Sequence, residues 1–376
     1  SGLDSYIQLH CTGSGWDGVD NVPVLQTVNG TTYAYVLYDG YGASGALVAK
    51  IRCAENGGSS IVWTTDPYGT EGTSLNAKSG FQLSTPYLDD KGPPDDASDD
   101  TLYVGTISQY DDYEGGEWLT GTGSKVMALT GLDQNKPTVT NVLTGINGQI
   151  NTPITTDGTY LYFGTWPGGS NAGTYYQVKL SDYSVKTFTP DSYGFYWAGA
   201  VSDGTNVYFG SDNGLLYWRS IADFDTTGGV LDLTDVASDA GNVRSTVMLD
   251  DGYLYFTTQG GYLWCCSYDD GLTVEWHKKL GATSTSTPTK VGDRIYVGYY
   301  SGFNAGGVQC VSADGSSVKT VVEGDGFPVQ SSIVVMGDGT GTDYLSDVMN
   351  GASEENTGIN IIVSKHSANA WINNHR

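Results

Sequence analysis

The run from Asn151 to Phe188 constrains the fold of this chain more than any other stretch. Apolar and polar residues alternate there in four short segments, the second of which contains Tyr160 and Tyr162, and turns rich in Gly, Asn and Asp separate the segments. Such period-2 alternation predicts four antiparallel strands joined as a meander. One sheet of this kind cannot bury both of its faces, so a stable fold requires the unit to recur.

The unit does recur along nearly the whole chain, each time with an aromatic residue in the second predicted strand. The positions are Tyr35, Tyr103, Tyr162, Tyr208, Tyr255 and Tyr296, with Ser346 aligned at the seventh. Successive spacings run from 41 to 68 residues, and the longest contain visible insertions. A spacing of about 40–50 residues is typical of four-stranded propeller blades. The sequence therefore predicts an all-β protein, a single β-propeller with seven blades.

The repeat boundaries follow from the same pattern. We expect an N-terminal segment at 1–21 and a propeller at 22–376, with blades at about 22–80, 81–147, 148–193, 194–238, 239–282, 283–326 and 327–376. The N-terminal segment contains one strand-like run, Ser5 to His10, which either closes its own ring, covers the base of the propeller, or adds a strand to a neighbouring subunit. A pair of β-sandwiches is the alternative all-β fold, but it does not predict one pattern repeated seven times.

The charge balance excludes some classes of partner. The chain has 42 Asp and Glu residues against 17 Lys and Arg, for a formal net charge of −25. An acidic surface of this kind repels nucleic acid and anionic membranes. No apolar run reaches the roughly 20 residues needed to cross a bilayer, so we expect no transmembrane segment.

Several features favour an extracellular protein. The chain opens on Ser1-Gly2, as a processed mature chain does, and Asn29-Gly30-Thr31 is its one N-x-S/T sequon. The five cysteines are Cys11, Cys53, Cys265, Cys266 and Cys310. Because Cys11 lies just before the first repeat and Cys53 lies inside it, this pair is the candidate disulfide.

Three recurring motifs carry a resemblance to a known family. Thr-Pro enters the first strand of several repeats, as at Thr85-Pro86 and Thr152-Pro153, and an Asp-Gly turn precedes a Tyr-Phe-Gly strand between Asp157 and Gly164. The third motif is G-x-x-x-x-W, as at Gly58 to Trp63. Together they resemble the PQQ-like, quinoprotein-type β-propeller repeat, a family that includes many secreted members without enzymatic activity. The resemblance covers nearly the whole chain and implies a fold rather than an activity.

Cys265-Cys266 is the sharpest candidate for chemistry in that family. Quinoprotein alcohol dehydrogenases carry an adjacent-cysteine disulfide ring that stacks on PQQ beside a Ca²⁺ ion. Here the two cysteines lie inside a predicted strand, where neighbouring side chains point to opposite faces, and Cys310 occupies the place of Cys265 in the next repeat. We therefore interpret them as buried structural residues, with a PQQ- and Ca²⁺-dependent oxidoreductase as the alternative.

Two acidic insertions in the second repeat are candidate calcium loops. The first contains Asp89, Asp90, Asp95, Asp96, Asp99 and Asp100, and the second Asp111, Asp112, Glu114 and Glu117. Hard oxygen ligands suit Ca²⁺, but the spacing matches no calcium motif that we can name. A solvated acidic loop is the other interpretation.

Aromatic residues near turns are the best signal for binding. The candidates are Trp118, Trp166, Tyr196, Trp197 and Phe303. Aromatic rings of this kind anchor protein interfaces or stack on sugars, although packing between blades also uses them. The favoured function is a secreted, non-catalytic propeller at the cell surface that binds protein, either other surface proteins or copies of itself in a homo-oligomer, filament or layer. A glycan-binding propeller is a further alternative.

Overall fold

The computed structural model describes an all-β protein in two compact units, residues 1–196 and 197–376. The described residues are 22–38, 47–54, 58–65, 84–92, 96–105, 110–114, 117–120, 124–269, 271–302, 304–325, 328–336, 360–364 and 371–373. Within these ranges there is no α-helix, and hence none long and apolar enough to cross a membrane.

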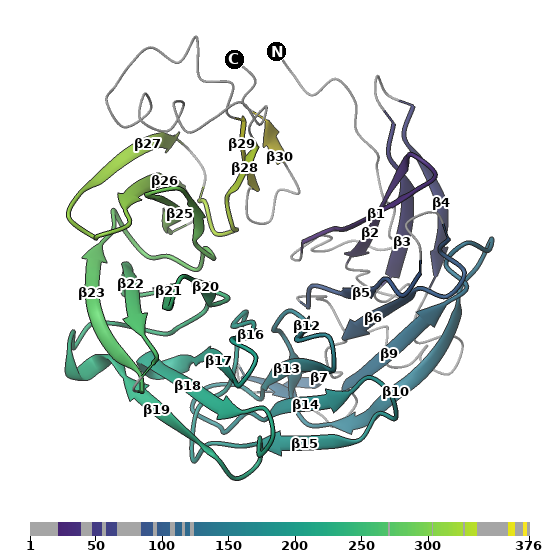
Figure 1. Ribbon diagram of the computed structural model, residues 1–376, viewed down its shortest axis with the longest axis horizontal. Helices are drawn as coiled ribbons and strands as arrows, with labels where there is room; N and C mark the ends of the chain where they lie inside the picture. The colour runs from purple at the N-terminus through teal and green to yellow at the C-terminus, as the bar shows by residue number, and fades with distance from the viewer. Residues whose placement is uncertain are drawn as a thin grey trace. The chain divides into compact units, whose positions relative to one another are not determined.

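The first unit contains three antiparallel meanders and a separate hairpin (Figure 1). The first sheet is β1 (Val24–Val28), β2 (Thr31–Tyr38), β3 (Leu47–Arg52) and β4 (Ser60–Thr65). The second is β5 (Tyr87–Asp89), β6 (Thr101–Gly105), β9 (Ser124–Thr130) and β10 (Thr138–Ile146), with the hairpin β7 (Tyr110–Glu114) and β8 (Glu117–Thr120) inserted after β6. The third is β11 (Gln149–Ile150), β12 (Thr155–Thr156), β13 (Tyr160–Trp166), β14 (Tyr175–Lys179) and β15 (Val185–Phe188), with β11 and β12 both paired to β13.

The second unit contains four sheets of the same topology. The fourth sheet is β16 (Val201–Ser202), β17 (Asn206–Ser211), β18 (Leu215–Ser220) and β19 (Gly228–Asp232), with short 3₁₀ turns η3 (Asp212–Gly214) and η4 (Leu233–Asp235). The fifth is β20 (Met248–Asp250), β21 (Tyr253–Thr258), β22 (Tyr262–Ser267) and β23 (Thr273–Lys279). The sixth is β24 (Thr289–Val291), β25 (Arg294–Ser301), β26 (Ala305–Ser312) and β27 (Val318–Asp325). The seventh is β28 (Val334–Met336), β29 (Asn360–Ser364) and β30 (Trp371–Asn373).

The predicted row of tyrosines forms the centre of six sheets. Tyr35, Tyr103, Tyr162, Tyr208, Tyr255 and Tyr296 all lie on the second strand of their sheet, and none is more than 4% exposed. In two sheets the tyrosine ring also packs on the tryptophan of the G-x-x-x-x-W motif. The ring centroids of Tyr35 and Trp63 lie 6.1 Å apart, as do those of Tyr255 and Trp276. The repeated pattern thus reflects repeated burial.

Asp-Gly turns hold the inner hairpins of the third and fourth sheets. Asp157 Oδ1 accepts hydrogen bonds from two backbone amides of its own turn, and its Oδ2 accepts one from the Tyr162 hydroxyl at 2.8 Å. Asp203 repeats the arrangement, with the Tyr208 hydroxyl donating to Oδ2 at 2.7 Å. One aspartate therefore caps the turn and also satisfies a buried tyrosine, which explains the spacing between these residues.

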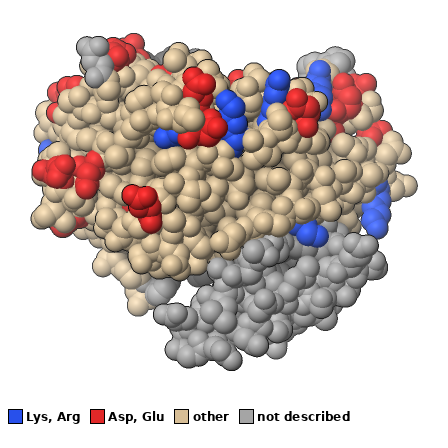
Figure 2. Space-filling model, turned by 90° about the horizontal axis from the view of Figure 1, so that it is seen from below, with Lys and Arg blue, Asp and Glu red and all other residues tan. Residues whose placement is uncertain are grey.

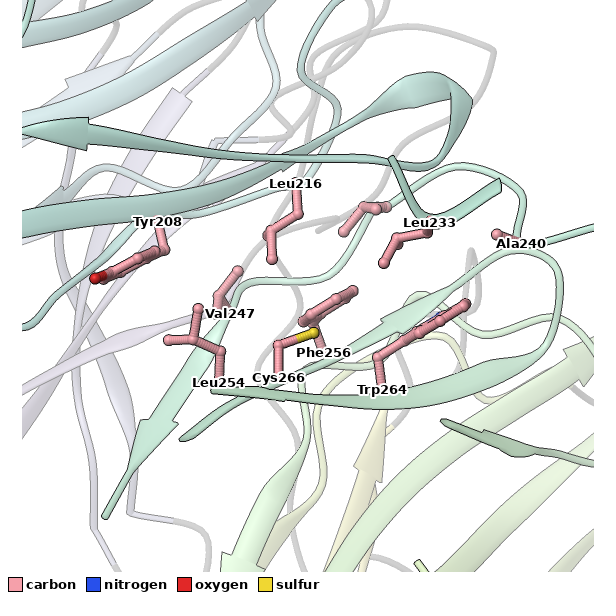
Figure 3. Packing of buried hydrophobic residues seen from close by; sticks show 10 residues of the cluster. Tyr208, Leu216, Leu233, Ala240, Val247, Leu254, Phe256, Trp264 and Cys266 are labelled. Carbon is pink, nitrogen blue, oxygen red and sulfur yellow. The ribbon is translucent and has the colours of Figure 1, made fainter. Parts of the chain in front are cut away.

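Neighbouring sheets within each unit bury their faces against each other. Figure 3 shows this for the fourth and fifth sheets, where Leu216 of β18 points toward Val247, Leu254 and Phe256. Trp264 of β22 is fully buried in the same cluster. Similar clusters join the first sheet to the second, the second to the third and the fifth to the sixth.

The Thr-Pro motif joins adjacent sheets at the start of their inner strands. The Thr85 side-chain hydroxyl accepts a hydrogen bond from the Val22 amide at 3.0 Å, and its carbonyl accepts one from the Ile154 amide at 2.9 Å. Thr287 similarly accepts from the Thr246 amide at 3.0 Å. Threonine supplies the acceptors, and the proline that follows has no amide proton to leave unpaired.

The structure departs from the sequence expectation in two places. The second acidic insertion forms a β-hairpin, β7–β8, which we had expected to be a loop. In the seventh sheet, β28 pairs with β29, and Val334 lies opposite Ile362. Ser346, which the sequence aligned with the second strand, lies outside the described residues, so that alignment stays a prediction.

Substituting Tyr208 with Phe tests the aspartate–tyrosine contact. A hydrogen bond to a charged group contributes about 1.5–3 kcal/mol, so we expect Tyr208→Phe to lower the free energy of unfolding by about 1–2 kcal/mol. The measurement is urea denaturation, with unfolding monitored by tryptophan fluorescence. Tyr253→Phe is the control, since Tyr253 is 39% exposed on the neighbouring sheet and its variant should change stability little. Equal losses in the two variants would contradict the role given to the Asp203 contact.

Candidate interaction surface

Two loops of the third sheet meet at one edge of that sheet. One is the connection 167–174 between β13 and β14, and the other is the segment 189–196 that follows β15. The Tyr193 amide donates to the Ser170 carbonyl at 2.9 Å, and the Gly173 amide donates to the Tyr193 carbonyl at 2.8 Å. These reciprocal backbone bonds fix each loop against the other.

Two glycines permit the close approach of these loops. A Cβ at Gly173 would lie 2.1 Å from the Thr165 carbonyl oxygen, and one at Gly164 would lie 2.7 Å from the side chains of both Tyr175 and Phe195. Tyr175 and Phe195 are fully buried and meet edge to face, with ring centroids 4.9 Å apart. Phe195 thereby anchors the second loop to the core of the sheet.

Three other aromatic side chains at this edge remain partly exposed, namely Trp166 at the end of β13 and Tyr193 and Tyr196 of the second loop, and we refer to them as the aromatic surface. The Trp166 and Tyr196 rings meet edge to face, with centroids 5.2 Å apart and an interplanar angle of 83°. Tyr193 has a positive φ of 65°, a conformation that costs energy for a bulky residue and that the surrounding backbone bonds enforce. The surface is therefore rigid before any partner arrives.

The structure brings together two of the five aromatic residues that the sequence singled out. Trp166 and Tyr196 form the contact just described. Trp197 is the first residue of the second unit, where it is half-buried with a positive φ of 56°. The Trp118 side chain and the whole of Phe303 lie outside the description. Tyr193, another aromatic residue that the sequence places near a turn, joins the surface through the backbone bonds of its loop.

The predicted calcium ligands have separate partners. Asp89 pairs with the Lys91 side chain at 3.2 Å, Asp96 accepts from the Ser98 amide at 2.9 Å, and Asp100 accepts from the Gln26 side-chain amide. Asp90 and Asp99 are exposed, and Asp95 lies outside the described residues. In the part of the chain that the structure describes, no three His, Cys, Asp or Glu side chains are grouped to hold a metal. The calcium site stays a prediction.

Asp100 belongs instead to a buried polar chain between the first and second sheets. It is 2% exposed, and the Gln26 amide that donates to it also accepts from the Tyr35 hydroxyl at 2.6 Å through its Oε1. Burial raises the pKa of Asp100. Lys50 lies on the same face of the first sheet and donates to the Leu132 carbonyl at 2.7 Å, and burial lowers its pKa. These groups act as structural links between the sheets.

The described cysteines are free thiols. Cys265 and Cys266 are neighbours on β22, where Cys265 packs in the cluster with the sixth sheet and Cys266 in the cluster with the fourth. Cys265 and Cys310 pair with Tyr255 and Tyr296 respectively, so they occupy equivalent positions. Burial raises the pKa of both thiols to about 11, which suppresses the reactive thiolate. The disulfide from Cys11 to Cys53 stays a prediction, because Cys11 lies outside the described residues. Cys53 is a free thiol in this structure.

Sequence reasoning missed a polar network on the loops of the second unit. Arg244 binds Asp212 through two parallel hydrogen bonds of 2.7 Å each. Two residues away, the Asn242 side chain donates to Gln259 at 2.9 Å and accepts from the Asn213 amide at 2.8 Å. The network ties the loop after the fourth sheet to the turns of the fourth and fifth sheets. The one signal in the sequence was the polar pair Asn242 and Arg244 directly after Gly241 in the connection between two predicted repeats.

Charged side chains are sparse on at least one face of the molecule. Figure 2 shows red and blue residues there separated by wide areas of uncharged ones. Some outer strands contain no charged residue, as in β10, whose nine residues carry no charge. The acidic balance of the chain is thus not spread evenly over its strands.

Comparison with known proteins identifies the fold. No protein-family model and no curated protein matches the sequence. Among solved structures, BamB from Moraxella catarrhalis superimposes with a TM-score of 0.50 and 14% identity, over 93% of this chain and 87% of that one. Sqt1 from Saccharomyces cerevisiae superimposes with a TM-score of 0.56 and 13% identity, over 91% of this chain and 80% of that one. Both are β-propellers, and this chain is one too, which confirms the predicted fold. The number of blades stays a prediction.

The pH dependence of stability tests the buried carboxyl of Asp100. Because the pKa of Asp100 is raised in the folded protein, folding favours the protonated carboxyl group. Asp100 therefore contributes most to stability at low pH, and this contribution is lost as the pH rises above 3.8, the ordinary pKa of an aspartate. We expect Asp100→Asn to become more stable relative to wild type as pH rises from about 3 to 6. Thermal unfolding of both proteins across this range gives the difference, with exposed Asp90→Asn as the control. A difference that is independent of pH would contradict the raised pKa.

Proposed function

We propose that this protein is an extracellular, non-catalytic β-propeller of the PQQ-like repeat type that serves as an interaction scaffold. The observation that carries the proposal is the aromatic surface, in which Trp166 at the end of β13 and Tyr193 and Tyr196 of a loop held by backbone bonds stay partly exposed. Aromatic rings on a rigid support lose little entropy on binding and are frequent anchors of protein interfaces.

The polar groups of the second unit support a scaffold rather than a reacting centre. Arg244 and Asp212 neutralise each other through a bidentate pair, and Asn242 is bonded on both its oxygen and its nitrogen. Side chains committed to holding loops together contribute rigidity. Cys265 and Cys266 pack in two different core clusters on opposite faces of one strand, which favours a packing role over the disulfide ring of the quinoprotein alternative.

The partner that we propose is a protein, either a surface protein or a further copy of this chain. For a partner other than this chain, a net charge of −25 favours a neutral or basic surface. Glycan binding is the second candidate, favoured by the half-exposed Trp166 ring, because indole rings stack on sugars. We also propose calcium in the 89–100 loop and a disulfide from Cys11 to Cys53 as stabilising features of an extracellular chain.

Substitution of the aromatic surface tests the proposal. Native protein isolated from the cell surface is expected to elute as an oligomer, or with a partner protein in constant ratio, by light scattering coupled to size exclusion. Trp166→Ala and Tyr196→Ala should weaken this association at least tenfold, since interface anchors contribute about 2 kcal/mol or more.

Tyr253→Ala is the matched control, an exposed aromatic residue outside the aromatic surface. It is expected to leave association unchanged. A polysaccharide array run with the same variants distinguishes the glycan candidate, which predicts retention that Trp166→Ala abolishes. Wild-type protein that is monomeric, free of partner and not retained by any polysaccharide would overturn both candidates.

A further inference from the structure

The hairpin between β1 and β2 ends in an exposed two-residue turn. Val28 pairs with Thr31, so Asn29 and Gly30 form the whole loop. Their φ angles are 49° and 73°, which are the left-handed values of a type I′ turn. Both residues are exposed, and no atom lies within 4 Å of the place where a Gly30 side chain would begin.

The fifth sheet contains the same turn with an aspartate in place of the asparagine. Asp250 pairs with Tyr253, and the loop between them is Asp251-Gly252, with φ angles of 47° and 84°. A type I′ turn in this chain therefore accepts a carboxylate as readily as an amide. The backbone geometry of this turn is therefore compatible with either asparagine or aspartate at its first position.

Asn29, Gly30 and Thr31 nevertheless form an N-x-T sequon, the one such sequon in the 376 residues. The sequon is the acceptor signal for N-linked glycosylation in extracellular proteins, and it is used where the asparagine is accessible. Here it lies at the tip of a hairpin with open space around the glycine. The asparagine amide and the threonine hydroxyl of the sequon are the two groups that the modification needs.

We propose that Asn29 carries an N-linked glycan in the native protein, an inference that rests on the proposed extracellular location. The donor is an oligosaccharide linked to a polyprenyl phosphate or pyrophosphate lipid. The Asn29 amide nitrogen forms a bond to C1 of the first sugar as the bond from C1 to the lipid phosphate oxygen breaks. The amide loses one proton and the lipid phosphate leaves, with no change in oxidation state. The glycan projects from the end of the first sheet that carries the β1–β2 turn.

Mass spectrometry of the protein from its native cells tests this inference. Peptides that contain residue 29 are expected to carry a hexose or hexosamine-containing adduct and to release sugar oxonium ions on fragmentation. Expressed in the same cells, Asn29→Asp and Thr31→Val should remove the adduct completely. Asn29→Asp recreates the Asp-Gly turn of the fifth sheet, so it removes the acceptor while keeping a turn that this chain already uses.

Thr31→Ser is the matched control, because it keeps the sequon hydroxyl and should keep the adduct. Thermal unfolding of all three variants checks that the first sheet is intact. Unmodified Asn29 in protein recovered from the cell surface would overturn the glycan and leave the extracellular scaffold in place. Protein found only inside the cell, with Asn29 unmodified, would overturn both. An adduct that persists in Asn29→Asp would place the modification elsewhere and also overturn the inference.

Discussion

Burial of each sheet face by the next sheet is the constraint on which the rest of this structure depends. A four-stranded meander has two faces, and its middle strands are buried on both. All five residues of β6 are buried, and so are five of the six residues of β21. A strand of that kind is stable only between two other sheets, because apolar area exposed to water costs free energy in proportion to its extent. The recurring tyrosines and the mutual packing of Leu216 with Phe256 are consequences of this requirement.

Tyrosine suits the centre of such sheets because its ring fills the space between them and its hydroxyl reaches the polar edge. Tyr162 and Tyr208 reach the aspartates of their own inner turns. Tyr35 reaches Gln26, whose amide in turn meets the buried Asp100 of the next sheet. The hydroxyl therefore has a different partner in different sheets, while the ring has the same role in all of them. This division lets one repeated residue serve sheets whose surroundings differ.

The same packing restricts the surfaces that a partner could contact. The middle strands have no free face, so a partner can meet only turns, loop segments and outer strands. In the third sheet, two loops joined by backbone hydrogen bonds present Trp166 and Tyr196 beside each other, although 30 residues separate them in the chain. In the second unit, the ion pair between Arg244 and Asp212 joins the corresponding loops of the fourth sheet. The sheets thus share one architecture while their loops have diverged in chemistry.

The sequence was most informative where the spacing of nearby residues alone determines the structure. Alternation with period two identified the second strand of six sheets, and the placement of Cys310 opposite Tyr296 matched that of Cys265 opposite Tyr255. It failed where a partner comes from another element. In the sequence, Asp100 is one of six carboxylates in a predicted loop. In the structure it is buried and accepts a hydrogen bond from Gln26 of the first sheet. In the seventh sheet, the strand that pairs with β28 begins at Asn360, where the sequence pattern had predicted the third strand and not the second.

The amino-acid pattern by itself determined that the chain folds into repeated antiparallel meanders, because alternation and turn chemistry act between residues a few positions apart. Only the tertiary structure decided which aromatic rings are anchors and which are exposed. Phe195 and Tyr196 are adjacent in sequence, but Phe195 is fully buried against Tyr175 while Tyr196 lies against Trp166 at the surface. That difference depends on contacts with residues that are distant in the chain, and such contacts exist only once the sheet and its two loops have come together.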